Sequence, residues 1–261
     1  MRQATGHSSD NQRKNETQTG SVVFLSNPLM SDIESDWSPI HDAAYNGRVL
    51  TLRNLIAQGT CVNLATLDRV SPLHGACLQG HTACAKLLIE NGANVNVPTL
   101  EQTTPLSEAC ARGHVACVTL LLQHGALPKG YSLSASPIHQ AAAKDYGYLC
   151  PGHPECIESQ VHHRADVDQH TDQSGSPLYT ACTNQHLSTV KKLLQLGASV
   201  NSSKDGDSPL NTAVCLSNPE LMSVLLEHGA DCSSRDTQGK QPLDLASCTA
   251  RGENSAGPQR R

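Results

Sequence analysis

The residues with the clearest chemical potential lie in one stretch near the middle of the chain. Cys150, His153 and Cys156 are spaced three residues apart, and His162 and His163 follow closely. Thiolates and imidazoles at such spacings are the ligands of structural zinc sites. The alternative is that His153, Cys156 and His163 occupy positions of an internal repeat and that Cys150 is incidental, because short Cys/His spacings also arise by chance. We favour this alternative, and predict no metal site and no cofactor.

Catalytic motifs are missing from the 261 residues. The sequence contains no G-x-S-x-G elbow, no Walker loop, no H-E-x-x-H and no dinucleotide-binding fingerprint. Asp166 and Asp168 form an isolated acidic pair, but they are in register with Asn94 and Asn96 of another copy of the repeat. A role in a turn or in contact with solvent is therefore expected for them. We predict that the protein is not an enzyme and has no catalytic residue.

The charge balance and the apolar pattern exclude two classes of partner. The net charge is −5, from 19 Lys and Arg against 24 Asp and Glu, without the basic cluster that nucleic-acid binding requires. The first residues have no apolar core of a signal peptide, and no apolar stretch is long enough to cross a membrane. We therefore predict a cytoplasmic, possibly nuclear, protein whose eleven cysteines remain thiols.

An internal repeat defines the elements that position these residues. The tripeptide Ser/Thr-Pro-Leu/Ile begins at residues 38, 71, 104, 136, 176 and 208, and a degenerate copy begins at 241. A period near 33 with this opening is typical of ankyrin repeats, in which one turn and two helices form each unit. The sequence predicts an all-α ankyrin-repeat solenoid of six helix-turn-helix repeats and a truncated seventh.

Each position that recurs in the repeat has a physical reason. The Ser or Thr is a helix N-cap and the Pro after it suits the first helical position. An Ala four residues after each Pro lets neighbouring helices approach closely, and a Gly ends the second helix in five repeats.

The fourth repeat departs from the pattern. It contains the insertion Asp145–Pro151, has Gln160 in the buried Leu position and has Arg164 where other copies have Gly. We expect Gln160 to need a polar partner and Arg164 to disfavour positive φ, and we favour a tolerated surface insertion over a bulge that shapes a binding face.

The two ends differ from the repeats. We predict disordered tails at residues 1–20 and 249–261, a repeat domain at 38–248, and an apolar segment at 21–37. That segment contains Val22, Val23, Phe24, Leu25, Leu29 and Met30. It either caps the first repeat or anchors a partner, since both uses remove apolar area from water.

The sequence also resembles one family in particular. The stretches that carry the resemblance are FLSNPLM, SDWSPIHDAA, RVSPLHGACLQGH, SPIHQAA, SPLYTAC and VKKLLQLGASVN, between Phe24 and Ala246. They are similar to the ankyrin repeat and SOCS box family, whose members are substrate-recognition subunits of cullin–RING ubiquitin ligases. The resemblance implies that the ankyrin stack holds a folded intracellular target protein, while a SOCS box binds elongins B and C and the cullin. Residues after Cys248 do not match a SOCS box, so we expect this chain not to bind elongin or cullin by itself.

The residues expected to contact a partner lie in the apolar segment and at two turns. They are Phe24, Leu25, Leu29, Met30, Asp68, Arg69, Leu100, Glu101 and Gln102. For the turn residues, the alternative is an ordinary solvent-exposed turn. The alternative function is a scaffold or decoy that binds the same target but delivers it to no ligase.

Overall fold

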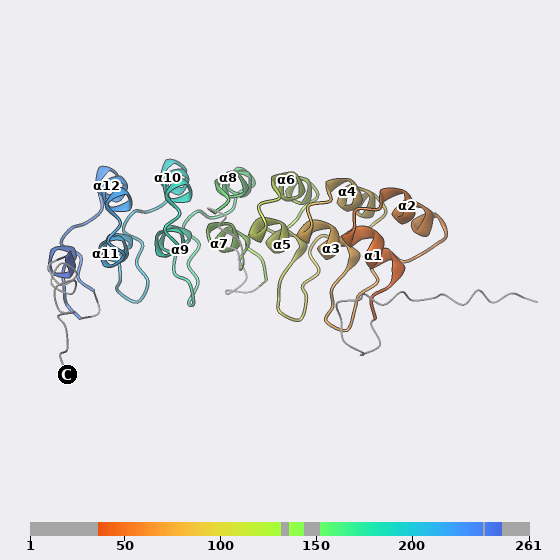
Figure 1. The fold of residues 1–261 in the computed structure, drawn as a ribbon, viewed down its shortest axis with the longest axis horizontal. Coiled ribbons are helices and arrows are strands. Elements are labelled where there is room, and N and C mark those ends of the chain that lie inside the picture. The colour runs from red at the N-terminus through yellow and green to blue at the C-terminus, as the bar shows by residue number, and fades with distance from the viewer. Residues whose placement is uncertain (1–35, 132–135, 144–151, 237, 247–261) are drawn as a thin grey trace, which may run out of the picture.

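The computed structural model describes residues 36–131, 136–143, 152–236 and 238–246 as a row of stacked helix pairs (Figure 1). The first three pairs are α1 (Pro39–Tyr45) and α2 (Val49–Ala57), α3 (Pro72–Leu78) and α4 (Thr82–Glu90), and α5 (Pro105–Ala111) and α6 (Val115–Gln123). The next three are α7 (Pro137–Ala142) and α8 (Pro154–His162), α9 (Pro177–Thr183) and α10 (Leu187–Gln195), and α11 (Pro209–Cys215) and α12 (Pro219–Glu227). A helical turn at 242–246 begins a seventh unit. The predicted all-α repeat solenoid is confirmed.

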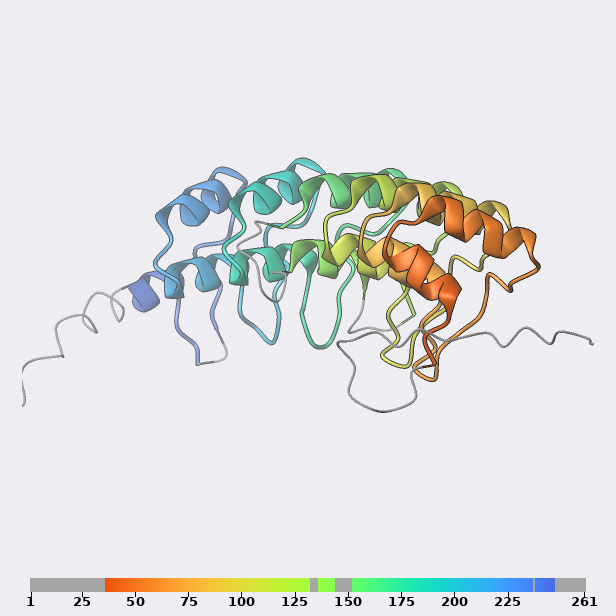
Figure 2. The ribbon, with the colours of Figure 1, turned by 45° about the vertical axis from the view of Figure 1, so that its right-hand side comes forward.

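The helices form two rows joined by long loops. The first helix of each pair packs against the first helix of the next pair, and the second helices pack likewise. The loops that connect successive pairs project from the row of first helices, on one side of the molecule (Figure 2). We call these loops fingers 1 to 6, at residues 58–71, 91–104, 124–136, 163–176, 196–208 and 228–241. In the described part of the chain, β-structure is limited to isolated bridges within fingers 4 and 5.

The first helices begin as the Ser/Thr-Pro pattern predicts. The hydroxyls of Thr104, Ser176 and Ser208 each accept a hydrogen bond from the amide three residues later. Such caps satisfy amides that have no partner within the helix. The alanines four residues after the prolines are at most 1% exposed in all six pairs, at Ala43, Ala76, Ala109, Ala141, Ala181 and Ala213. The close helix contact expected from them is therefore present.

At the turn between the two helices of a pair, a glycine packs against a histidine of the next pair. Gly80 has φ +75°, and a Cβ on it would lie 2.6 Å from the Nδ1 atom of His114 in the next pair. Gly113 and His153 repeat this arrangement one pair further along. The ring of the histidine thus occupies the space that any other side chain would need. His114 and His153 serve the packing of the stack.

A side-chain hydrogen bond between successive fingers recurs along the array. Asn63 donates to the carbonyl of Gly92 over 2.9 Å, and Asn96 donates to the carbonyl of Gly125 over 3.0 Å. Asp168 and Asn201 occupy the same position in later repeats and accept amides of the following loop, from Ser199 and Asp231. We call each of these bonds a rung. Lys129 takes this position between repeats 3 and 4, and no rung forms there among the described residues.

The fourth repeat has a buried Gln160 with polar partners, as the sequence predicts, but Arg164 does not avoid positive φ. The side chain of Gln160 is fully buried and donates to Cys110 Sγ and to the Cys156 carbonyl, both at 3.3 Å, while its Oε1 atom has no partner. Arg164 adopts φ +68°, the left-handed conformation that glycine takes in the other repeats. Residues 144–151, with the whole insertion, lie outside the described residues. The fourth pair thus retains the fold with an incompletely paired core amide.

Candidate protein-binding face

The first helices and the fingers form one surface, which we call the finger face. In finger 1, the amide of Thr66 donates to the carbonyl of Val70 over 3.0 Å, and Arg69 has φ +62°. In finger 2, the amide of Thr99 donates to the carbonyl of Thr103 over 2.9 Å. Fingers 1 and 2 therefore each end in a closed turn that presents the tip away from the helices (Figure 2).

The tips of fingers 1 and 2 are joined to each other. The amide of Leu100 donates to the carbonyl of Asp68 over 3.0 Å. This bond brings the residues predicted at the two turns, Asp68–Arg69 and Leu100–Gln102, into one continuous patch. The other predicted residues lie outside the described part of the chain: Phe24, Leu25, Leu29 and Met30.

Exposed leucines accompany this patch. Leu67 is 81% exposed and Leu100 is 58% exposed, so both tips present apolar area to solvent. The amide of Leu67 donates to the carboxylate of Asp36, which fixes the tip of finger 1 to the start of the described chain. Sequence reasoning missed Leu67, although a leucine beside the turn residues Asp68 and Arg69 was a readable signal of an exposed apolar side chain.

A small apolar cavity opens on the same face. Its volume is about 180 Å³, and it is lined by Trp37, Tyr45, Val70, His74, Gly75, Leu78, Thr99 and Glu108. The ring of Trp37 lies 5.1 Å from His41 and 5.9 Å, edge-on, from Tyr45. Burial raises the pKa of the Glu108 carboxyl, against the opposing effects of a hydrogen bond from Thr103 and the charge of Arg112. The cavity fits one apolar side chain beside a carboxyl group.

The histidines that follow Pro-Leu/Ile are structural. His41 Nε2 lies 3.1 Å from the carbonyl of Val70, and His139 Nε2 lies 3.0 Å from that of Gly175. Burial lowers the pKa of all three members of this set, that of His74 to about 4. His41 and His139 are thus held by the adjacent finger, and His74 by Ser71 at the start of its own helix, so packing explains all three without any chemistry at the face.

The predicted Cys/His positions of repeat 4 are separated by packing. Cys156 is fully buried, and burial raises the pKa of its thiol to about 12. His162 and His163 each bond a carbonyl one turn earlier in α8. No three metal ligands gather in the described residues, from which Cys150 is missing. That the protein binds no zinc remains a prediction.

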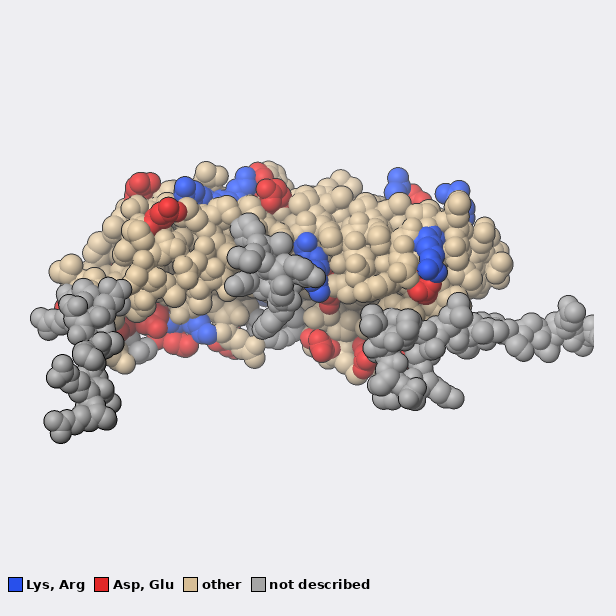
Figure 3. Space-filling model, in the orientation of Figure 1, with Lys and Arg blue, Asp and Glu red and all other residues tan. Residues whose placement is uncertain are grey.

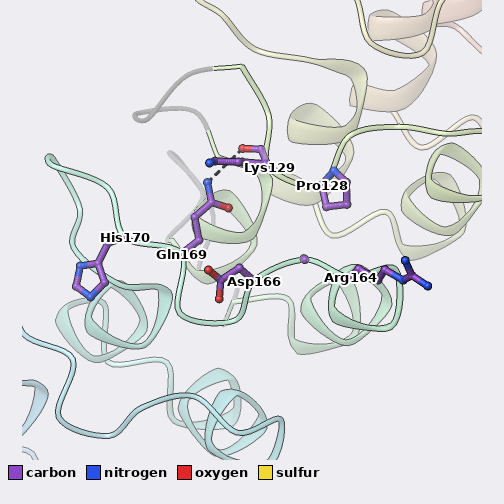
Figure 4. A pocket seen from close by; sticks show the side chains of 7 residues that line it. Pro128, Lys129, Arg164, Asp166, Gln169 and His170 are labelled. Carbon is purple, nitrogen blue, oxygen red and sulfur yellow. Dashed lines mark hydrogen bonds between the residues drawn. The ribbon is translucent and has the colours of Figure 1, made fainter.

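A second cavity lies at the junction between repeats 3 and 4, where no rung forms among the described residues. It has a volume of about 330 Å³ and is lined by Pro128, Lys129, Arg164, Ala165, Asp166, Gln169 and His170 (Figure 4). Gln169 crosses the junction by donating to the Lys129 carbonyl over 3.3 Å and by accepting a bond from the Ser136 hydroxyl. The basic side chains here are spread around the rim and accompany Asp166, so the arrangement resembles a packing gap more than an anion site.

Charges are sparse on the body of the molecule. In Figure 3, carboxylates lie along the edge formed by the fingers and also along the opposite edge, and the lysines and arginines visible on this side are scattered. No helix in the described residues is long and apolar enough to cross a lipid bilayer. The leucines at fingers 1 and 2 differ from other exposed apolar side chains, such as Leu50 and Leu243, in lying on two tips that are bonded to each other.

Comparison with known proteins agrees with this geometry. A family model described as "Ankyrin repeats (3 copies)" matches residues 18–99, 40–135 and 138–236. The crystal structure of the human ASB11 ankyrin repeat domain superposes with a TM-score of 0.74 at 46% identity, over 85% of this chain and 100% of that one. The ankyrin repeat domain of Bcl-3 superposes with a TM-score of 0.66 at 27% identity, over 80% and 93%.

Full-length relatives narrow the assignment. Ankyrin repeat and SOCS box protein 9 of Mus musculus is 58% identical over 224 residues, which are 86% of this chain and 75% of that protein. The chain belongs to the ankyrin repeat and SOCS box family. Human ankyrin repeat and SOCS box protein 11 is 58% identical over 217 residues, which are 83% of this chain and 65% of that protein. The chain thus spans about two thirds to three quarters of the family members it matches.

Proposed function

We propose that the chain recognises a folded intracellular protein as the substrate-binding part of a cullin–RING ubiquitin ligase. The observation that carries the proposal is the pair of finger tips joined by the Leu100–Asp68 bond, with exposed leucines beside the cavity at Trp37. Tips that are ordered before binding lose little conformational entropy on contact. The family supplies the expectation of a ligase, and the face itself suggests a non-enzymatic binding module in the cytoplasm or nucleus.

A double substitution tests the face directly. Leu67→Asp with Leu100→Asp places two charges on the joined tips, whereas Leu50→Asp places one on α2, where Leu50 is 76% exposed in the other row of helices. We expect quantitative mass spectrometry of proteins bound from cell extract to show a partner retained by the wild type and by Leu50→Asp but lost from the double variant. If all three proteins retain the partner equally, the tips of fingers 1 and 2 do not bind it.

The apolar segment needs its own test. We propose that it contributes to binding through Phe24, Leu25, Leu29 and Met30, or that it caps the first repeat. Deletion of residues 21–35 is expected to weaken binding of that partner or to lower the melting temperature, and deletion of 1–20 serves as the control. If both deletions leave affinity and melting temperature unchanged, the segment has neither role.

Whether the chain binds the elongins can be tested separately from whether it binds a target protein. Elongin recognition requires an apolar helix that fills a groove, and residues 249–261 offer only the methyl groups of Ala250 and Ala256 as apolar side chains. We therefore expect these 261 residues, mixed with purified elongins B and C, to elute separately in gel filtration. Such a chain would act as a scaffold or decoy. A stoichiometric complex with the elongins would instead support direct ligase assembly.

A further inference from the structure

A third cavity lies on the finger face, far from fingers 1 and 2. Its volume is about 390 Å³, and it is bounded by α9, α11, fingers 5 and 6 and the helical turn at 242–246. The residues that matter for its chemistry are Tyr179, Asp207, Asn211, Leu216, Asp236 and Leu245. It therefore combines carboxylates, an amide and apolar walls in one open space.

Two carboxylates line this cavity, and the charge of Lys240 also acts on its lining, at Cys215. In the described part of the chain, neither Asp207 nor Asp236 forms an ion pair, although Asp236 Oδ1 accepts the amides of Gln238 and Lys240. Burial raises the pKa of Asp207, and the nearby charges of Asp236 and Asp205 raise it further. Both carboxylates are thus close enough to repel each other, and a positive group between them would relieve that repulsion.

A buried amide in the same cavity lacks every expected partner. Asn211 is only 2% exposed, and neither its Oδ1 nor its Nδ2 atom has a hydrogen-bond partner. It occupies the repeat position of His41 and His139, whose longer rings reach a carbonyl of the adjacent finger. A buried amide without hydrogen-bond partners destabilises the folded state. Its free acceptor beside two carboxylates points to a ligand that donates several hydrogen bonds.

The walls suit a particular cation. Tyr179 supplies an aromatic ring, and Leu216 and Leu245 supply aliphatic surface. Arginine matches this combination, because its guanidinium stacks on aromatic rings and donates to carboxylates in a fixed fork while its stem packs on apolar side chains. Lysine presents a compact charge with no planar face.

We propose that this cavity binds an arginine side chain presented by a partner protein. The inference rests on the proposed function, since it gives the recognised protein a second contact at repeats 5 and 6. Its chemistry is nevertheless independent of fingers 1 and 2. A small arginine derivative can therefore test it without the partner.

The experiment is an NMR titration of the whole chain with N-acetyl-arginine amide. We expect saturable shifts of the Asn211 side-chain amide, and no shifts with N-acetyl-citrulline amide, which has the same shape without the charge. Asp207→Asn and Asp236→Asn are each expected to weaken binding roughly tenfold. Asp172→Asn, the same change on finger 4 outside the cavity lining, should leave it unchanged.

Asn211→His separates the ligand role from a fold role. The change restores the residue type found in repeats 1, 2 and 4, so we expect a higher melting temperature together with loss of arginine binding. Equal shifts with the citrulline compound, or undiminished binding to Asn211→His, would overturn the proposal. Equal binding of N-acetyl-lysine amide would overturn the preference for arginine. If the arginine derivative binds while the Leu67/Leu100 variant keeps its partner, only the function proposed for fingers 1 and 2 fails.

Discussion

At the scale of single residues, we expect a glycine that packs against a turn histidine to contribute measurably to stability. Gly80 combines positive φ with the ring of His114 at 2.6 Å from a Cβ position, whereas Gly92 has φ +87° and nothing within 4 Å. Gly92→Ala should cost about 1 kcal/mol of unfolding free energy through backbone strain alone. Gly80→Ala should cost about 2–4 kcal/mol, because overpacking adds to that strain. Urea denaturation measures both, and equal losses would show that the ring contact carries no energy.

Burial of His74 makes stability depend on pH. Its folded pKa of about 4 lies below the ordinary value of 6.5, so the unfolded chain binds the proton more readily. The contribution to stability is present above pH 6.5 and is lost as the pH falls toward 4. From pH 7 to pH 5, we expect the wild type to lose about 2 kcal/mol more than His74→Ser, which introduces the residue type found at Ser107. Denaturant midpoints at the two pH values test this, and parallel losses would contradict it.

Much of this residue-level structure was predictable, and the rest depends on contacts between repeats. The sequence assigned His153 and His163 to positions of the repeat and predicted that Gln160 needs a polar partner. It did not identify Cys110 as the partner, since that contact joins residues fifty positions apart. It also missed the exposure of Leu67, because a leucine read from its type alone is assigned to the core.

At the scale of elements, the fourth helix pair has a polar side chain at a core position of its second helix. Gln160 in α8 stands where α6 has Leu121, which is fully buried. Gln160→Leu removes a buried carbonyl without a partner and should raise the unfolding free energy by about 1–2 kcal/mol, slowing amide hydrogen exchange in α8. The reciprocal Leu121→Gln should cost about 3 kcal/mol. Faster exchange in Gln160→Leu would mean that the two bonds of Gln160 outweigh its unpaired oxygen.

The helix pairs themselves followed from local chemistry. Ser or Thr before Pro predicts where each first helix begins, and Gly predicts where most second helices end, because caps and left-handed residues act within a few positions. The rungs were not predicted, although the residues that form them recur at one position of the repeat. Asn63, Asn96, Asp168 and Asn201 are in register along the repeat, and Lys129 breaks the series. Only the loop geometry shows that these side chains reach the next repeat.

At the scale of the whole molecule, thiols report on the integrity of the stack. The described cysteines are free, with Cys61, Cys215 and Cys232 exposed and the others buried, at Cys77, Cys84, Cys110, Cys117, Cys156 and Cys182. Iodoacetamide should alkylate the three exposed thiols in native protein and the six buried ones only in denaturant, since a buried thiol is inaccessible whatever its pKa. Peptide mass spectrometry resolves each site. Native labelling of several buried thiols would indicate that the repeats open independently.

The architecture was predictable from periodicity, whereas the partner was not. A repeat position such as Ala109 is constrained by its neighbours in the stack, so its role can be read from its recurrence. Finger-tip residues such as Asp68 and Leu100 differ between repeats, and their association depends on a hydrogen bond between two tips. The sequence therefore indicated where binding is possible but not what is bound.

The absent rung at Lys129 has a mechanical consequence. At the junction between repeats 3 and 4, Gln169 makes the hydrogen bond that a rung makes elsewhere, while α5 packs against α7 and α6 against α8 as at the other junctions. The helix rows therefore hold this junction together, and the finger side is the part that lacks the recurring bond. We expect bending between repeats 3 and 4 to change the spacing on the finger side about the packed helices. A partner of different curvature would then be met by that change in spacing while every helix pair stays intact.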